Sequence, residues 1–248
     1  MTSKYIYIRL FADLNYFVPV KLKNRNIRLI VFGRPSIKDV IESIGVPHTE
    51  FEMVTLNGQP TETNKNVKEN DQLVVYPHFF QLSIDQLEID DLPANQGFKF
   101  VLDVHLGKLA AMLRLLGFDS EYNNMLEDDE IIDIACNENR IILSRDLGIF
   151  KNSRVKQGYF PRSQDPKIQL KEVVDRYGLN YHIKPFSRCI KCNGELYEID
   201  KESVKSEILE NTNLYYKEFY SCSICRKTYW KGSHYQQMLE FVQNYSLN

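Results

Sequence analysis

Two aspartates each follow a short apolar run that has the character of a buried strand. Asp103 comes directly after the run 100–102, and Asp146 comes three residues after the run Ile141–Leu143. Continuous apolar runs of this length are typical of strands that a parallel sheet buries on both faces. Because ligands bind at the carboxyl ends of such strands, the sequence predicts that both carboxylates lie at the same edge of one sheet.

A third acid is expected at this edge. Asp128 opens the predicted helix 128–139, and helices in such sheets begin after the carboxyl ends of strands. Converging carboxylates repel one another unless a cation neutralises them, and Mg²⁺ or Mn²⁺ suits hard oxygen ligands. Such an ion lowers the pKa of a bound water and clamps a phosphate oxygen. We therefore expect Asp103, Asp128 and Asp146 to be catalytic, holding magnesium or manganese and hydrolysing a phosphodiester.

Each of these acids also has an ordinary structural interpretation. Asp103 can cap a helix that begins near Val104, and Asp128 is a common type of N-cap residue. Asp146, two residues before Gly148, suits a turn. The sequence alone leaves both interpretations open.

Three basic residues near these acids are candidates for contacting the phosphates of a substrate. They are Lys108, Arg114 and Arg145. Lys108 and Arg114 lie six positions apart on the predicted helix 106–116, so they do not share one face. Arg114 is also near the end of that helix, where a cation is favoured without any ligand.

Four of the five cysteines form two CxxC pairs. Cys189 and Cys192 are separated from Cys222 and Cys225 by 29 residues. This pattern predicts one tetrahedral Zn²⁺ of structural type, because four thiolates leave no position open for water. Disulfides are the alternative, and the reducing cytoplasm disfavours them. The fifth cysteine, Cys136, is expected to pack inside the helix 128–139.

Basic and aromatic residues alternate after the second cysteine pair. They are Lys227, Tyr229, Trp230, Lys231, His234 and Tyr235. This composition suits the stacking of nucleobases and contact with phosphate, but the same rings can pack the core of a small zinc-binding unit. Both interpretations remain open at this point.

The first 82 residues predict a β-β-α-β-β order. Alternating apolar residues mark strands near 4–11 and 28–32, Ser36 is the expected N-cap of a helix that Gly45 ends, and two further strands flank an Asn57-Gly58 turn. This order resembles the ubiquitin-like β-grasp, and especially small sulfur-carrier proteins. Those carriers end in a free Gly-Gly tail, whereas this chain continues after His78, so we expect a docking or scaffolding role.

The predicted organisation is a multi-domain α/β protein. We expect a ubiquitin-like β-grasp (α+β) over residues 1–82, an acidic linker over 83–97, an α/β domain with a parallel sheet over 98–183, and a four-cysteine zinc ribbon with a C-terminal segment over 184–248. The interval between the cysteine pairs is long enough to hold an insertion around 198–211.

Composition limits the possible surroundings and partners. No apolar run approaches the roughly 20 residues that a membrane span needs, and the N-terminus does not have the pattern of a signal peptide. We therefore place the protein in the cytoplasm, with no membrane partner. Residues 1–139 carry a balance of −8 and residues 140–248 a balance of +6, so the second half is suited to a polyanion. Chance variation on a solvated surface explains the same asymmetry, and both interpretations stay open.

Taken together, residues 98–236 resemble the Mut-seven C-terminal ribonuclease family, a PIN-like nuclease fold with a zinc ribbon. The resemblance lies in the segments FVLDVHLGKLAAMLRLLGFDS, DDEIIDIACNENRIILSRD, RCIKCNGEL and YWKGSHYQQM. It implies an acidic, divalent-metal-binding site that maps onto Asp103, Asp128 and Asp146. Sites of this kind usually hold a fourth acid, for which Asp119 and Asp165 are candidates. A ubiquitin-like domain precedes this module in many bacterial members.

Two functions are consistent with these features. The first is a metal-dependent ribonuclease that hydrolyses RNA. The second is a non-catalytic RNA- or protein-binding module, in which the β-grasp domain recruits a protein partner and the zinc ribbon binds the target.

Overall fold

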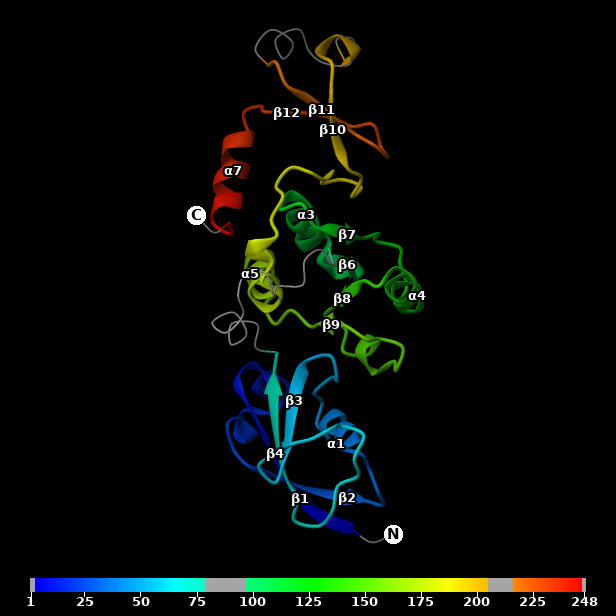
Figure 1. The fold of residues 1–248 in the computed structure, drawn as a ribbon, viewed down its shortest axis with the longest axis vertical. Coiled ribbons are helices and arrows are strands. Elements are labelled where there is room, and N and C mark those ends of the chain that lie inside the picture. The colour runs from blue at the N-terminus through cyan, green and yellow to red at the C-terminus, as the bar shows by residue number, and fades with distance from the viewer. Residues whose placement is uncertain (1–2, 79–96, 205–215, 247–248) are drawn as a thin grey trace.

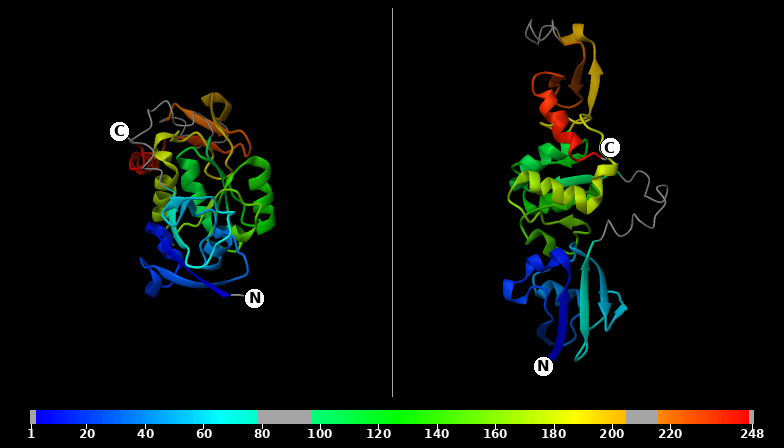
Figure 2. Two further views of the ribbon diagram at one scale, coloured as in Figure 1. Left: turned by 60° about the horizontal axis from the view of Figure 1, so that its bottom comes forward. Right: turned by 90° about the vertical axis from the view of Figure 1, so that its left-hand side faces the viewer.

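Three sheets follow one another along the long axis of the molecule in the computed structural model, within the part that is described, residues 3–78, 97–204 and 216–246 (Figure 1). The N-terminal sheet lies at one end, the central sheet in the middle and the C-terminal sheet at the other end (Figures 1 and 2). Within these ranges, no helix combines the length and apolar character needed to cross a bilayer.

The N-terminal unit is a β-grasp, as the sequence predicts. Its strands are β1 (Ser3–Leu10), β2 (Ile27–Phe32), β3 (Phe51–Leu56), β4 (Gln59–Pro60) and β5 (Gln72–Pro77), in the order β2-β1-β5-β3-β4. β1 and β5 pair in parallel, and the other pairs are antiparallel. Helix α1 (Ile37–Ser43) begins at Ser36, which exchanges hydrogen bonds with Asp39 in a capping box, so the predicted start of this helix is confirmed.

The central unit is a four-stranded parallel sheet with helices on both faces. Its strands are β6 (Lys99–Leu102), β7 (Asp119–Glu121), β8 (Ile141–Leu143) and β9 (Gly158–Tyr159), in the order β7-β6-β8-β9. Its helices are α3 (Gly107–Leu115), α4 (Asp128–Glu138) and α5 (Pro166–Tyr177). Phe100 and Leu102 pack in the core beneath α3 and α5, whereas Val101 and Ile142 pack in the core beneath α4. The predicted parallel α/β arrangement is therefore confirmed.

The C-terminal unit is a small antiparallel sheet followed by a helix. The sheet has the order β10 (Leu196–Ile199), β11 (Phe219–Cys222) and β12 (Thr228–Trp230). Helix α7 (Tyr235–Gln243) lies alongside the central unit (Figure 1), and Val242, Met238 and Phe241 join the core beneath α3 and α5. The C-terminal helix thus attaches the small sheet to the central domain.

Several details differ from the sequence-based expectations. Glu127, not Asp128, is the N-cap of α4, because the Glu127 and Glu130 side chains form the capping box. Cys136 is exposed rather than packed inside α4, since its sulfur faces the carbonyl of Arg154.

Some predictions concern residues that the structure does not describe. The predicted linker 83–97, apart from Gly97, lies outside the described residues, and so does the part of the proposed insertion beyond Val204. The domain boundaries at 82, 97 and 183 therefore stay predictions.

A buried charged cluster joins the β-grasp to the central domain. Its centre is Glu50, whose side chain is 0% exposed. One carboxylate oxygen accepts the Phe160 N–H at 2.8 Å, and the other accepts the Arg162 guanidinium at 2.7 Å and lies 3.8 Å from Arg176. Although burial opposes it, the charge of Glu50 raises the pKa of Arg162. A buried carboxylate paired in this way fixes which surfaces of the two domains meet.

Further contacts complete this junction. Arg176 donates to the Thr49 carbonyl at 2.7 Å, and His48 Nε2 lies 2.8 Å from the Val155 carbonyl. Arg162 also pairs with Asp13 at 2.9 Å, on the segment that follows β1. The junction therefore uses two separate segments of the β-grasp.

Replacing Glu50→Gln is expected to uncouple the two domains. Glutamine keeps the size of the side chain but removes the charge that faces two arginines. Breaking a buried pair in this way costs about 3–5 kcal/mol. Here the two domains can separate and return the arginines to water, which limits the loss of stability. Calorimetry should then show the β-grasp unfolding apart from the rest. Glu62→Gln, at an exposed position, is the matched control, and identical profiles for Glu50→Gln and the parent contradict the prediction.

Candidate functional site

The pairing of β6 with β8 places Asp103 beside Ser144. Leu102 lies opposite Leu143 in this parallel pair, and the Asp103 N–H donates to the Leu143 carbonyl at 3.1 Å. Asp103 is only 4% exposed, and its Oδ2 accepts the Ser144 hydroxyl at 2.5 Å and the Arg145 N–H at 2.7 Å. The Asp103 carboxylate is therefore held in one orientation by the end of the neighbouring strand.

Asp103 also caps the turn that follows it. Its Oδ1 accepts the His105 N–H at 2.8 Å and so begins the 3₁₀ turn Val104–Leu106. The capping interpretation is thus confirmed, but it does not use the whole carboxylate. A carboxylate offers about four acceptor positions, and three hydrogen bonds leave one of them for a ligand.

Ser144 connects Asp103 to Asp146. While its hydroxyl donates to Asp103, its oxygen accepts the Asp146 N–H at 2.8 Å. The exposed Asp146 carboxylate accepts the Gly148 N–H at 2.6 Å, which is the predicted turn chemistry. Sequence reasoning missed Ser144, and the only available signal was a small polar residue directly after the apolar run 141–143.

Asp128 is the exposed first residue of α4. Partial burial and the charges of Asp146 and Asp103 raise the pKa of Asp128. The charges of Asp103 and Asp146 therefore act on Asp128, although the oxygen atoms of the three acids are not gathered as closely as the four cysteine sulfur atoms. In the described part of the chain, none of the three forms an ion pair with a lysine or arginine. Three carboxylates without a cationic partner are a donor set suited to a hard divalent cation.

The structure overturns the prediction that Arg114 contacts phosphate. Arg114 is 3% exposed, and its guanidinium donates to the carbonyls of Ser120, Ile190 and Lys191 at 2.9, 3.1 and 3.0 Å. It ties α3 to the first cysteine pair instead.

Arg145 is used in a similar way, whereas Lys108 is available. The Arg145 guanidinium donates to the carbonyls of Pro161, Arg162 and Ser163 at 2.7, 2.8 and 2.5 Å, so it serves the chain rather than a ligand. Lys108 is exposed in the first turn of α3, which follows the turn that Asp103 begins. Of the three predicted basic residues, Lys108 is the one whose charged group makes no hydrogen bond with the described part of the chain.

Both candidate fourth acids have structural partners. Asp119 opens β7 opposite Lys99, at the amino ends of the strands, and pairs with Arg140 at 2.6 Å. Despite its burial, hydrogen bonds from Arg140 and Asn193 lower the pKa of Asp119. Asp165 caps α5 by accepting the Lys167 N–H at 2.8 Å. Asp119 is thus a structural partner at the opposite edge, and Asp165 is engaged as a helix cap.

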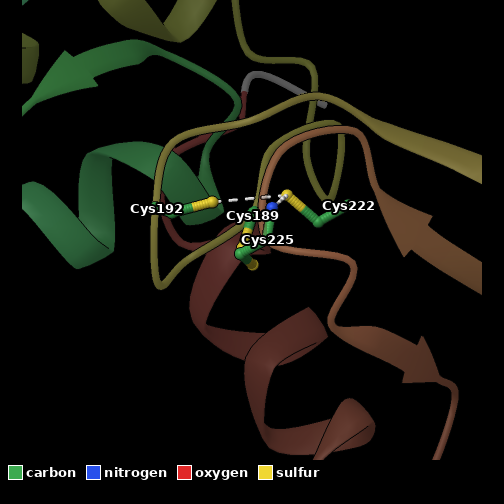
Figure 3. Close-up of side chains that lie close together, drawn as sticks. All are labelled: Cys189, Cys192, Cys222 and Cys225. Carbon is green, nitrogen blue, oxygen red and sulfur yellow. Dashed lines mark hydrogen bonds between the residues drawn. The ribbon is translucent and has the colours of Figure 1, made fainter.

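The four cysteines converge at the end of the small antiparallel sheet (Figure 3). All four sulfur atoms lie within 4.8 Å of one another, the only ligand group of this compactness among the described residues. Cys189 and Cys225 are 3.7 Å apart, and Cys192 and Cys222 are 3.3 Å apart, measured between their sulfur atoms. Tetrahedral zinc with Zn–S bonds of about 2.3 Å places its sulfur ligands roughly 3.8 Å apart. These spacings suit one tetrahedral ion and are too long for disulfides.

The first cysteine pair forms a tight turn that leaves room for the second. Asn193 has a φ of 69°, its N–H donates to the Cys189 carbonyl at 2.9 Å, and the Cys189 N–H donates to the Gly194 carbonyl at 2.7 Å. A Cβ on Gly194 would lie 2.7 Å from the sulfur of Cys222. Glycine is therefore required here for the two pairs to meet.

The thiols of this cluster differ in acidity. Against the effect of burial, hydrogen bonds from the Tyr229 hydroxyl and from neighbouring groups lower the pKa of Cys189 to about 6. Burial is the main cause that raises the pKa of Cys192 to about 12. A metal ion that binds here displaces the protons of the remaining thiols.

Several of the basic and aromatic residues that follow the second cysteine pair pack within the small sheet, as the second of the two interpretations predicts. The Tyr229 hydroxyl lies 3.0 Å from the Cys189 sulfur, and the ring of Trp230 lies 6.4 Å from that of Phe219. Lys231 pairs with Glu218 at 2.5 Å. These side chains mainly stabilise the small sheet.

The molecule thus combines a ubiquitin-like β-grasp, a parallel α/β domain with three acids at one edge, and a compact four-cysteine cluster. The family model of the Mut7-C RNAse domain matches residues 98–242, more than half of the chain, so the chain belongs to this family. The model described as Mut7-C ubiquitin matches residues 3–83. The suspected family and the order of its domains are therefore confirmed.

Two solved structures are similar to the β-grasp. A crystal structure of H. volcanii small archaeal modifier protein 1 is 18% identical, with a TM-score of 0.24 over 30% of this chain and 97% of that chain. A crystal structure of SAMP1 from Haloferax volcanii is 19% identical, with a TM-score of 0.26 over 31% and 97%. No curated protein matches the chain.

Asp128→Asn is expected to stabilise the protein slightly at neutral pH without divalent cations. Partial burial, and after it the charges of Asp146 and Asp103, raise the pKa of Asp128, so its charged form is disfavoured in the folded state. At an exposed position the gain should be at most about 0.5 kcal/mol, or about 1–2 °C in Tm. The gain should vanish as the pH falls below roughly 3, where both states are protonated.

Thermal melts over this pH range check the prediction. Glu62→Gln removes an exposed charge on the β-grasp, away from these acids, and is the control, for which no gain is expected. A lower Tm for Asp128→Asn at pH 7 contradicts the idea that the three acids repel one another.

Proposed function

We propose that the protein hydrolyses phosphodiester bonds of RNA with one or two divalent ions, Mg²⁺ or Mn²⁺, held by Asp103, Asp146 and Asp128. Membership of the Mut7-C RNAse family supports a nuclease-related function. The observation that supports the finer proposal is the link of Asp103 to Asp146 through Ser144 at the end of β8, because neither acid has a basic partner among the described residues. Such ions, when bound, supply an activated water and stabilise the charge on the phosphate.

The three acids differ in the part they play. Asp103 is buried and fixed by Ser144 and Arg145, so it defines the position of the site. Asp146 and Asp128 are exposed at the ends of a turn and of a helix, and can adjust to a ligand. Lys108, exposed in the first turn of α3, is the basic residue that we propose contacts a substrate phosphate.

Asp103→Asn and Asp146→Asn should each slow RNA cleavage at least about 100-fold. Each change removes a charge from the proposed ion site, and losing such a ligand removes several kcal/mol of transition-state stabilisation. Asp103→Asn should also destabilise the fold by about 1–3 kcal/mol, because an amide cannot accept all three of the hydrogen bonds that Asp103 accepts.

The variant at the exposed Asp146 distinguishes a loss of catalysis from a loss of stability. Cleavage of mixed single-stranded and structured RNA, with Mg²⁺ or Mn²⁺ supplied, is measured beside Tm for both variants. Asp175→Asn, which changes an acid on the exposed part of α5, is the control. If Asp146→Asn cleaves as fast as the parent with an unchanged Tm, the proposed site is wrong.

The alternative function is a non-catalytic RNA- or protein-binding module. The position of one candidate fourth acid favours it, because Asp119 lies at the opposite edge of the sheet and pairs with Arg140. RNA binding by the parent protein, without cleavage in the presence of either ion, supports this alternative. A ubiquitin-like domain suggests a protein partner, which we propose docks on the β-grasp. The cytoplasmic location stays a prediction.

We propose that the four cysteines bind one structural Zn²⁺. The support is the sulfur spacing, which suits a tetrahedral ion. The ion would connect the turn 189–194 with the segment 222–225, and so fix the small sheet against α3.

Cys192→Ser should lower the zinc content and loosen the C-terminal unit. A small sheet has little core of its own, so hydrogen exchange should rise over β10, β11 and β12 while the β-grasp stays protected. Cys136→Ser, at an exposed cysteine away from the cluster, is the matched control. Reduced parent protein that contains less than about half an equivalent of zinc contradicts the proposal.

A further inference from the structure

A cavity of about 530 Å³ lies at the end of the central sheet opposite the acids. Lys99, which opens β6, and Asp119, which opens β7, line it together with residues of the segment 181–188 that leads to the four-cysteine cluster. Asp103 follows the other end of β6, four residues and roughly 13 Å away along the strand. The cavity is therefore distinct from the acidic site, and its volume is that of a small-ligand site.

The charge of the lining is positive. Lys99 and Lys184 are exposed, and neither pairs with a carboxylate in the described part of the chain. Asp119 is neutralised by Arg140 at 2.6 Å and by Arg188 at 3.4 Å. The other acid of the lining, Glu195, lies 4.0 Å from Arg188, so neither acid pairs with the two ammonium groups, and a phosphate is the group they suit.

Aromatic rings form another part of the lining. The rings of Phe98 and His182 lie 5.3 Å apart, and Tyr181 is 45% exposed. Flat rings beside unneutralised cations are the combination that binds a base and its phosphate in single-stranded nucleic acids.

The wall between these groups is preformed. Gly117 has a φ of +96°, and a Cβ there would lie 2.0 Å from the Lys184 carbonyl oxygen. The Lys184 N–H donates to the Leu116 carbonyl at 3.0 Å. Only glycine allows this approach, so the backbone that presents Lys184 is fixed before any ligand arrives.

We propose that this cavity binds one nucleoside phosphate unit of a single RNA strand, at a distance from the acids. The choice of RNA as the source of that unit rests on the proposed ribonuclease function, whereas the nucleotide chemistry rests on the cavity itself. The phosphate contacts Lys99 and Lys184, and the base stacks on the ring of Tyr181.

Binding measured without cleavage tests this proposal. Full-length zinc-loaded protein is titrated into a fluorescent single-stranded RNA of about 12 nucleotides, without added Mg²⁺ or Mn²⁺, over a range of salt. The combined variant Lys99→Gln/Lys184→Gln should weaken binding at least about 10-fold at low salt, and reduce the salt dependence by about 0.7 for each lysine. Tyr181→Leu should weaken binding by about 5-fold or more with an unchanged salt dependence, because stacking carries no net charge.

The controls separate this site from the acids and identify the source of the ligand. Lys65→Gln, at an exposed position of the β-grasp, should bind as the parent does. If AMP displaces the RNA from the parent protein but not from the lysine variant, the cavity binds a free nucleotide. If the lysine variant weakens RNA binding but AMP does not displace the RNA, the cavity binds a nucleotide within the strand. If the lysine and tyrosine variants bind RNA and AMP as the parent does, the inference is wrong. The readout needs no cleavage, so an inactive acidic site would leave it standing.

Discussion

The parallel pairing of β6 with β8 is the constraint on which the acidic site depends. With Leu102 opposite Leu143, the first residues beyond the two strands are Asp103 and Ser144, and they meet at 2.5 Å. A shift of one residue in this register would turn every buried side chain of β8 to the other face. Because Phe100, Leu102, Ile141 and Leu143 fill one core and Val101 and Ile142 the other, the packing on both faces fixes the register. The position of the carboxylate is therefore a consequence of how the apolar residues pack.

Sequence reasoning succeeds where the signal is local. The Ser36 cap, the apolar runs of β6 and β8, and the two CxxC pairs each depend on neighbouring residues, and the structure contains all three. It fails where a polar side chain finds its partner far along the chain. Arg114 looked available for phosphate, but the carbonyls that bury it lie 76 and 77 residues away. Ser144 carried no periodic signal, because its importance comes from the neighbouring strand.

The junction at Glu50 belongs to the same class of non-local contacts and reaches the acids. Glu50 holds the Phe160 N–H and the Arg162 guanidinium, which lie 110 and 112 residues away. The carbonyls of the same segment, 161–163, accept the guanidinium of Arg145, whose own N–H donates to Asp103. A continuous set of hydrogen bonds therefore runs from the β-grasp to the central acid. The β-grasp thus supports the segment that positions Asp103, in addition to any partner it recruits.

Arginines and lysines have different tasks in this molecule, and the difference follows from their chemistry. Arg114, Arg145 and Arg140 donate to backbone carbonyls, because a planar guanidinium has five donors and loses less on burial than an ammonium group. Each of them ties together segments distant in sequence. The ammonium groups of Lys108 and Lys99 stay exposed at the two ends of the central sheet. A lysine that remains hydrated gives up little when it exchanges water for a phosphate. The arginines therefore hold the framework together, and the exposed lysines are the cations that an anionic ligand would meet.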